Sequence, residues 1–429
     1  MLLDLLYGLA ILVLSPWLLL RSIRTGRYRR NSAAKLWGIS QVAVPRDGAV
    51  AWFHGVSVGE VHLLRQIVRG FRERHPAWCV VVSSTTETGL AEAAKHFPDL
   101  TVIPYPFDFS WAVRRTLRAV RPSLIVLAES ELWPNFLRAA ERARVPVVVV
   151  NGRMSPRSAR RFARLAKLAR RLLFDRVTVF AMQSEAYAAN LRSLGVAADR
   201  VRVTGSVKYD GVYGEKDNPK TRDLRTLLGI EPTDLVWVAG STHDPEERIA
   251  LTAYANLKRQ YPALKLVLVP RAPERFDEVA GLIAATGLPF ARRSQQNKES
   301  RGAAVILIDT LGELGAAWGL ATVGFTGGSL NDKRGGQSMI EPAGFGAPVL
   351  FGPHTWNFKD AVAGLLDCGG ALRVADSAEL EREVGRLLAD PTLRDRIGSA
   401  ARAFVQSQQG ATKRTLDVLD QVMALPTIR

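Results

Sequence analysis

Residues 53–61 read Phe-His-Gly-Val-Ser-Val-Gly-Glu-Val and mark the point where an apolar run turns into a helical pattern. The run over residues 48–56 is nearly continuous in apolar side chains, which predicts a strand covered on both faces of a parallel sheet. After Glu60, apolar residues recur at helical spacing, namely at Val61, Leu64, Ile67, Val68 and Phe71. A buried strand followed at once by a helix predicts the α/β fold class.

The same alternation of apolar runs and helical patterns occurs twice along the chain. The first set of predicted strands covers residues 48–56, 78–85, 101–105, 123–129, 145–151, 176–183 and 200–207. The second set covers residues 235–240, 264–270, 304–309, 321–326, 348–352 and 371–374. A polar segment over residues 210–220 interrupts the rhythm and is the predicted linker. We therefore expect two doubly wound, Rossmann-type domains with a ligand cleft between them, at the carboxyl ends of the strands.

Composition sets the broad class of the protein. A chain of 429 residues is too long for one ordinary core, so about two domains are expected. Lys and Arg exceed Asp and Glu by 58 − 41 = 17, which favours anionic partners. Cys79 and Cys368 lie far apart and no Cys/His cluster accompanies them, so the sequence predicts neither a disulfide framework nor a metal site.

The N-terminal residues predict a membrane anchor. Residues 2–20 are apolar except for Asp4 and Ser15, and a spanning helix needs roughly 20 such residues. Arginines follow at once, and no positively charged segment precedes the run, so an uncleaved anchor over residues 1–22 fits better than a signal peptide. The positive-inside rule then leaves the remaining chain in the cytoplasm. The alternative is a helix that is buried or lies on the membrane surface.

Several common enzyme signatures are absent from the sequence. There is no Gly-x-Gly-x-x-Gly after a strand, no Gly-x4-Gly-Lys-[Ser/Thr] and no His-Glu-x-x-His. Nor is there an Asp-x-Asp pair of the kind that holds a divalent metal on a nucleotide diphosphate. Nicotinamide enzymes and P-loop enzymes are therefore disfavoured.

Glu60 has two possible roles. Ser57 to Glu60 form the Ser-x-x-Glu pattern of a capping box, in which the carboxylate reaches back to the N–H group of Ser57. A carboxylate stabilised in this way is a weak base, so capping and base catalysis shift its pKa in opposite directions. If Glu60 is a base, its side chain should point toward the ligand and leave Ser57 to cap the helix alone.

Other polar clusters also follow predicted strands of the first half. Glu129 and Glu131 come directly after residues 123–127, where they could be functional or could cap the next helix. Lys208 precedes the linker and could neutralise a phosphate or be solvated. Residues 155–174 predict one basic amphipathic helix, suited to anionic lipid or to a solvated face.

In the second half, the segment over residues 327–348 carries the strongest signal. Its paired glycines precede a helix and could leave backbone N–H groups free for a phosphate, with Glu341 able to accept from ribose hydroxyls. The alternative is a flexible loop before a capped helix. Residues 240–247 are explained by helix-start chemistry and carry little functional weight. Residues 270–276 and 309–314 also follow strands.

Taken in order, these motifs resemble those of 3-deoxy-D-manno-octulosonate (Kdo) transferases of lipopolysaccharide assembly, which are GT-B-fold glycosyltransferases. The matching motifs are VSVGE, ESELWPN, NGRMS, GSVKYD, AGSTHDPEE, PRAPERF, DTLGEL and GG…EPAGFGAPVLFGPHTWNF. The resemblance implies transfer of Kdo from CMP-Kdo to a lipid A precursor, with inversion and without a metal or other cofactor. It also implies an anionic inner-membrane surface, and not nucleic acid, as the further partner.

The resemblance also implies roles for individual residues. Glu60 would be the general base, and Glu129 and Lys208 would stabilise the transition state. The residues that would hold CMP are Pro270, Arg271, Leu311, Gly312, Glu313, Ser338, Met339, Ile340 and Glu341. Residues 23–212 would form the acceptor-binding domain and residues 213–429 the CMP-sugar-binding domain, with the last helix packing back on the first.

The chain departs from the family pattern at two places. Gln337 and Ser338 stand where the family usually has His-Asn, and Ala272 stands where it has His. An imidazole is lost at both, which bears on donor affinity and donor identity. Two alternatives therefore stay open, namely a GT-B transferase for another nucleotide sugar and a catalytically inactive protein that binds lipid or nucleotide.

Overall fold

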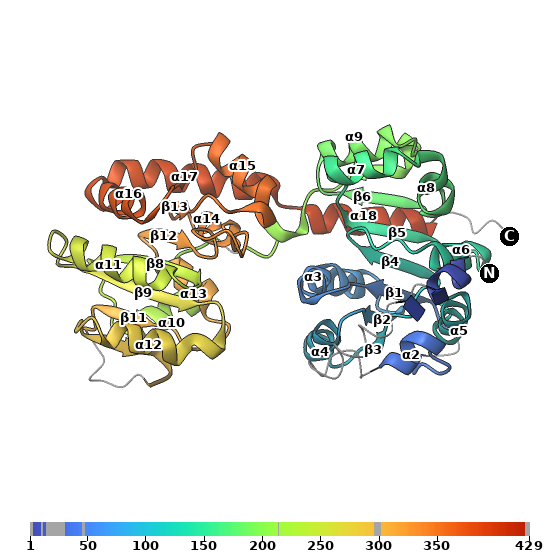
Figure 1. Cartoon of the computed structure of the whole chain (residues 1–429), viewed down its shortest axis with the longest axis horizontal. Helices are drawn as coiled ribbons and strands as arrows, with labels where there is room; N and C mark the ends of the chain where they lie inside the picture. The colour runs from blue at the N-terminus through green and yellow to red at the C-terminus, as the bar shows by residue number, and fades with distance from the viewer. Residues whose placement is uncertain are drawn as a thin grey trace. The chain divides into compact units, whose positions relative to one another are not determined.

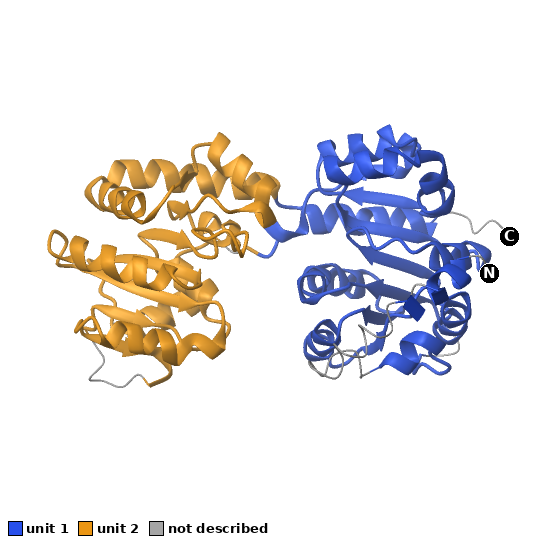
Figure 2. Ribbon diagram, viewed as in Figure 1, with its two compact units in different colours: residues 1–211, 409–429 blue, residues 212–408 orange. Residues whose placement is uncertain are grey.

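The computed structural model describes residues 3–9, 12–13, 31–44, 48–212, 214–295 and 302–424. The chain forms two compact units, residues 1–211 with 409–429 and residues 212–408 (Figure 2). Each unit contains a seven-stranded sheet whose paired strands are all parallel. The prediction of two doubly wound α/β units is confirmed.

Unit 1 has the strand order β3-β2-β1-β4-β5-β6-β7 (Figure 1). The strands are β1 (Val50–His54), β2 (Cys79–Ser84), β3 (Thr101–Pro104), β4 (Leu124–Ala128), β5 (Val147–Gly152), β6 (Val179–Met182) and β7 (Val201–Val203). The order reverses between β1 and β4, and open α/β sheets bind ligands where the order reverses, at the carboxyl ends of the strands. The loops after β1 and β4 therefore occupy the favoured position for a site.

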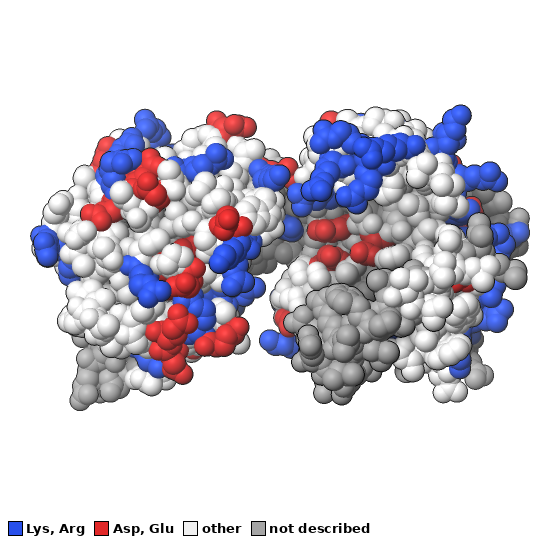
Figure 3. Space-filling view, viewed as in Figure 1, with Lys and Arg blue, Asp and Glu red and all other residues white. Residues whose placement is uncertain are grey.

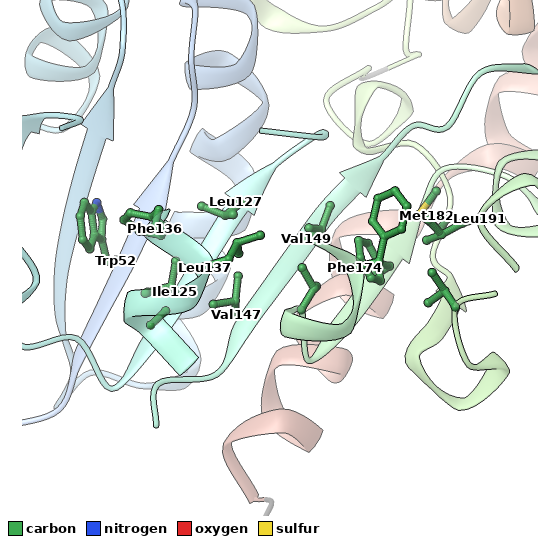
Figure 4. Packing of buried hydrophobic residues seen from close by; sticks show 14 of the residues in the cluster. Trp52, Ile125, Leu127, Phe136, Leu137, Val147, Val149, Phe174, Met182 and Leu191 are labelled. Atoms are coloured by element: carbon green, nitrogen blue, oxygen red, sulfur yellow. The ribbon is translucent and has the colours of Figure 1, made fainter. Parts of the chain in front are cut away.

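Helices cover both faces of the unit 1 sheet. The helices are α2 (Ser32–Trp37), α3 (Val58–Arg74), α4 (Glu87–His96), α5 (Ser110–Val120), α6 (Pro134–Arg142), α7 (Pro156–Ala163), α8 (Ala166–Leu172), α9 (Glu185–Ser193) and α18 (Ala411–Ala424), with 3-10 turns η1 (Phe174–Arg176), η2 (Ala198–Arg200) and η3 (Val207–Tyr209). One buried cluster joins α3, α4 and α18 to the sheet, and a second joins α5, α6 and α9 to the opposite face. Trp52 and Phe136 pack edge to face within the second cluster, their ring centroids 5.3 Å apart (Figure 4).

The predicted basic helix over residues 155–174 is wrong in its continuity. The structure breaks it into α7 and α8 at Leu165, whose backbone leaves the helical region (φ −131°, ψ 37°). The break exposes Leu165 and Leu168, which continuous helical spacing would have placed on the buried stripe. Two leucines thus lie at the surface among arginines.

The C-terminal helix α18 belongs to unit 1. It packs against α3 and β6 and contributes Leu416 and Leu419 to the buried cluster. The Asp210 carboxylate, which follows η3, accepts from the N–H groups of Gly410 (2.7 Å), Ala411 (3.3 Å) and Thr412 at the start of this helix. A carboxylate at a helix N-terminus satisfies donors that lack partners in the helix, so η3 and α18 hold each other in place.

Unit 2 has the strand order β10-β11-β9-β8-β12-β13-β14. The strands are β8 (Leu235–Thr242), β9 (Leu264–Pro270), β10 (Phe290–Arg292), β11 (Val305–Leu307), β12 (Val323–Thr326), β13 (Val349–Phe351) and β14 (Ala371–Arg373). The helices are α10 (Pro219–Leu228), α11 (Glu246–Lys258), α12 (Phe276–Ala284), α13 (Leu314–Leu320), α14 (Ile340–Gly344), α15 (Lys359–Asp367), α16 (Ser377–Ala389) and α17 (Pro391–Gln408), with 3-10 turns η4 (Pro273–Arg275), η5 (Arg293–Gln295) and η7 (Trp356–Phe358). The edge strand β10 was absent from the predicted set. Here the strand order reverses beside β8.

The N-terminal residues 3–9 are helical and bind to unit 1 through polar side chains. Asp4 Oδ1 accepts from the Ser110 N–H (2.8 Å) and from Asn135 Nδ2 (3.2 Å). The Tyr7 hydroxyl donates to Asp108 Oδ2 (3.0 Å). The predicted anchor over residues 1–22 lies mostly outside the described residues. Within the part that the structure describes, no helix is both long and apolar enough to cross a membrane.

Candidate active site

Glu60 is the third residue of α3, and its carboxylate folds back over the loop that joins β1 to α3. Oε2 accepts from the Val56 N–H (2.5 Å), and the Ser57 hydroxyl donates to Oε1 (3.3 Å). Ser57 makes no capping hydrogen bond of its own. Neither half of the predicted capping box forms, because Glu60 accepts from the N–H group of Val56 instead of that of Ser57. The expectation that Ser57 caps the helix alone is wrong as well. The ionised carboxylate is the stronger acceptor, so it takes the donors of the loop.

The surroundings of Glu60 make it an unusually basic carboxylate. Burial raises the pKa of Glu60 to about 7, which the hydrogen bond from Val56 opposes and the nearby charges of Glu129 and Glu131 reinforce. A base works best when its pKa lies near the working pH. Glu60 is thus held by the loop before the helix and yet retains the basicity that proton abstraction requires.

Glu129 follows β4, the strand next to β1, so it lies at the same edge of the sheet as Glu60. Its backbone adopts the left-handed region at φ 59°, where its N–H donates to the Val150 carbonyl (2.9 Å). Such a conformation costs on the order of 1–3 kcal/mol for a residue other than glycine and is concentrated at functional sites. Glu131 accepts from Trp133 Nε1 (2.7 Å), which orients the second carboxylate of the pair.

Lys208 lies on the turn η3, which packs against α3. Asn151, at the end of β5, is fully buried and left-handed (φ 51°), and its Oδ1 accepts from the Val207 N–H (3.1 Å). Asp210 fixes the other end of the turn through α18. The Lys208 side chain is exposed between these two attachments. Unit 1 thus presents Glu60, Glu129 and Lys208 at the carboxyl-end edge of its sheet.

In unit 2, Pro270 ends β9 and Arg271 follows it. The Arg271 N–H donates to the carbonyl of Thr242 at the end of β8 (3.1 Å), and its side chain is exposed. Burial raises the pKa of Glu341, and the charge of Arg271 partly offsets this effect. Arg271 and Glu341 therefore lie near each other, one a cation and the other an acceptor.

Leu311, Gly312 and Glu313, which the sequence analysis expected to contact CMP, form an exposed turn after β11. The Glu313 carboxylate accepts from Arg293 Nη2 (3.0 Å) and from the Thr310 hydroxyl, so it holds the turn in place. Gly312 adopts φ 88°, and the Leu311 side chain is 75% exposed. The turn thus offers an apolar side chain and backbone groups, whereas its carboxylate is occupied.

The glycine-rich segment is bound by a residue that the sequence analysis weighted little. Glu246, at the start of α11, is fully buried. Its carboxylate accepts from the N–H groups of Gly328 (2.6 Å), Ser329 (2.9 Å), Leu330 (3.0 Å) and His243 (3.0 Å). The expectation that paired glycines leave these N–H groups free for a phosphate is therefore wrong at residues 328–330.

In the next part of the segment, the N–H groups of residues 336 and 337 also have hydrogen-bond partners. The N–H groups of Gly336 and Gln337 donate to the carbonyls of Gly328 (2.7 Å) and Gly327 (3.1 Å). The Gln337 Nε2 lies 3.4 Å from His243 Nε2. α14 begins at Ile340 with Met339 as its N-cap, and the N–H groups of a first helical turn have no acceptor within their own helix. Of the predicted residues, Met339, Ile340 and Glu341 therefore carry such N–H groups, whereas Ser338 precedes the helix.

We predict that Glu246→Gln destabilises unit 2, because an amide cannot replace a carboxylate with four N–H donors. Hydrogen bonds to a charged group contribute about 1.5–3 kcal/mol each, so the free energy of unfolding of unit 2 should fall by at least that amount. Urea denaturation measures the change. Glu231→Gln, at an exposed position in the loop before β8, is the control. Equal unfolding curves for the two variants would contradict the assigned role of Glu246.

Comparison with known proteins gives one consistent family. Residues 23–211 match the family described as 3-Deoxy-D-manno-octulosonic-acid transferase (kdotransferase). The chain is 33% identical over 419 residues to the 3-deoxy-D-manno-octulosonic acid transferase of Haemophilus influenzae, covering 96% of this chain and 97% of that one. It is 35% identical over 431 residues to the enzyme of the same name from Bordetella pertussis, covering 96% and 98%.

Among solved structures, UDP-GlcNAc 2-epimerase from Neisseria meningitidis has a similar fold. It covers 87% of this chain and 100% of its own, with a TM-score of 0.59 and 13% sequence identity. At this identity the likeness concerns the fold alone.

Proposed function

The chain belongs to the 3-deoxy-D-manno-octulosonic acid (Kdo) transferase family, and from this premise we propose how it carries out the transfer. The donor is CMP-Kdo, the acceptor is a sugar hydroxyl of a lipid A precursor, and transfer proceeds with inversion and without a metal. The observation that carries the proposal is the identity to named Kdo transferases over nearly the whole chain. The basic Glu60 carboxylate at the sheet edge supports it.

Glu60 activates the acceptor. Its carboxylate takes the proton of the acceptor hydroxyl as that oxygen forms the new glycosidic bond and the bond to the CMP phosphate oxygen breaks. A raised pKa makes the carboxylate a competent base near neutral pH. The hydrogen bond from Val56 fixes Oε2, and Oε1, which has only the longer contact with the Ser57 hydroxyl, receives the proton.

The departing group is a phosphate ester that carries its charge away without protonation, so cationic help is sufficient. Lys208 provides a flexible point charge for this purpose, and Glu129 stabilises the transition state. CMP is held by residues of unit 2: Pro270, Arg271, Leu311, Gly312, Glu313, Ser338, Met339, Ile340 and Glu341. Among these, Arg271 supplies charge, the exposed Leu311 supplies an apolar contact and the start of α14 supplies N–H donors.

The protein acts at the anionic inner-membrane surface, anchored through residues 1–22 with both units on the cytoplasmic side. The docking of Asp4 and Tyr7 on unit 1 favours an anchor that lies on the membrane surface, because it leaves the neighbouring apolar side chains more than half exposed. These side chains are Leu5, Leu6, Leu9, Leu12 and Val13. Trp37 and Trp111 lie nearby in unit 1 with exposed rings, as is common at membrane interfaces.

A basic surface supports the same location. Lys and Arg side chains gather over the part of unit 1 formed by α7, α8 and α9 (Figure 3). On α7, on α8 and at the first of the two positions between them these are Arg157, Arg160, Arg161, Arg164, Lys167, Arg170 and Arg171. Exposed Leu165 and Leu168 lie among them, and cations around apolar side chains suit an anionic lipid surface.

The proposed reaction is tested by incubating the protein with CMP-Kdo and a lipid A precursor and analysing the lipid by mass spectrometry. We expect a lipid heavier by Kdo, with release of CMP. Turnover of a different nucleotide sugar alone would support the alternative transferase. Absence of turnover with every nucleotide sugar, despite ligand binding, would support the inactive protein.

For the base, we predict that Glu60→Gln lowers the transfer rate by about 10²–10⁴-fold, the usual contribution of a general base. CMP affinity and melting temperature should change little, because the amide oxygen can still accept from Val56. Glu73→Gln, at an exposed position on the same helix, should keep full activity. A variant that loses stability but still transfers Kdo would show that Glu60 only stabilises the loop and the helix start.

For the membrane, we predict that the full chain stays on anionic vesicles at high salt, whereas a chain lacking residues 1–22 binds only at low salt. An anchor is insensitive to salt, but attraction between basic residues and lipid is screened. Vesicle flotation measures both. Release of the full chain by salt would contradict the anchor, and failure of the shortened chain to bind at any salt would contradict the basic surface.

A further inference from the structure

Two histidines and a glutamate converge on the surface of unit 1 where α3 and α4 pack together. His62 lies on the second turn of α3, and Glu92 and His96 lie one turn apart on α4. Residues four apart share one face of a helix, so both side chains of α4 project toward the same spot. The three side chains come from helices that are packed in one buried cluster against the sheet.

The two imidazoles point at the same carboxylate oxygen. His96 Nε2 lies 2.7 Å and His62 Nε2 lies 3.3 Å from Glu92 Oε1. The three candidate ligand atoms lie within 4.8 Å of one another, and the imidazole centroids are 5.0 Å apart. With metal bonds of about 2.0–2.2 Å, tetrahedral ligand atoms stand about 3.3 Å apart. The side chains therefore need only small torsional changes to enclose an ion.

The exposure of the cluster suits a bound ion that keeps contact with solvent. The side chains of His62, Glu92 and His96 are 45%, 24% and 18% exposed. Two of the three are thus mostly covered, and both sit on the packed helix face, while solvent can reach from the side of His62. Three protein ligands and one water complete a four-coordinate shell.

We propose that His62, Glu92 and His96 form a binding site for a divalent transition metal, with zinc as the preferred ion. Two imidazole nitrogens and one carboxylate oxygen suit Zn²⁺, Co²⁺ or Ni²⁺, whereas Mg²⁺ and Ca²⁺ prefer oxygen ligands alone. The ion joins α3 to α4 and stabilises unit 1. The site is separate from the proposed reaction, which uses no metal.

The test is titration of the metal-free full-length chain with Zn²⁺ by calorimetry and with Co²⁺ by visible absorption. We expect one ion per chain, a d–d absorption typical of four-coordinate Co²⁺ and a higher melting temperature with Zn²⁺. His62→Ala, Glu92→Gln and His96→Ala should each weaken Zn²⁺ binding at least about tenfold.

The matched control is His75→Ala. His75, at the end of α3, pairs with the carboxylate of Asp420. In the described part of the chain no third metal-ligating side chain joins this pair. This variant should bind Zn²⁺ as the parent does. Equal binding by the control and the three ligand variants, or no stoichiometric binding by the parent, would overturn the site.

A chelator separates this inference from the proposed function. Removing the metal should lower the melting temperature and leave the rate of Kdo transfer at a permissive temperature unchanged. Loss of transfer that Zn²⁺ restores would overturn the structural role assigned to the ion. Because binding is measured without substrates, the result stands whether or not the chain transfers Kdo.

Discussion

A glutamate at the start of a helix, whose carboxylate accepts from backbone N–H groups of loops at the carboxyl ends of the strands, fixes the loops of both units. In unit 1, Glu60 follows β1 and accepts from Val56. In unit 2, Glu246 follows β8 and accepts from four N–H groups, three of them in the glycine-rich segment. The loops leave the carboxyl ends of buried strands, where backbone donors without partners are costly. In each unit one carboxylate provides the hydrogen-bond acceptor for such backbone donors.

The two carboxylates differ in what remains available for chemistry. Glu246 is fully buried and fixed by its four donors, so it serves the structure of the loop. Glu60 has one backbone donor and one hydroxyl, is partly exposed and has a pKa raised to about 7. Capping and base catalysis are therefore compatible at Glu60, because burial and neighbouring acids outweigh the stabilising hydrogen bond. The turn that carries Lys208 is likewise fixed by hydrogen bonds, to Asn151 at one end and through Asp210 at the other.

The sequence predicted the sheets well and the contacts less well, for physical reasons. Buried parallel strands are continuous apolar runs, so they were found, whereas the three-residue edge strand β10 ends in Arg292 and has no such run. Spacing placed Glu246 at a helix start but could not show where its carboxylate pointed. His62 and Glu92 lie on different helices, so their convergence depends on packing that no sequence spacing records. The anchor prediction concerns residues mostly outside the described part of the chain.

Chemical rescue tests most directly whether Glu60 removes the acceptor proton. In Glu60→Ala, added formate can take the place of the missing carboxylate. We expect that formate restores Kdo transfer in this variant and that sodium chloride at equal ionic strength does not. A folded variant that binds CMP but gains no activity from formate, or one as active as the parent without it, would show that Glu60 is not the base.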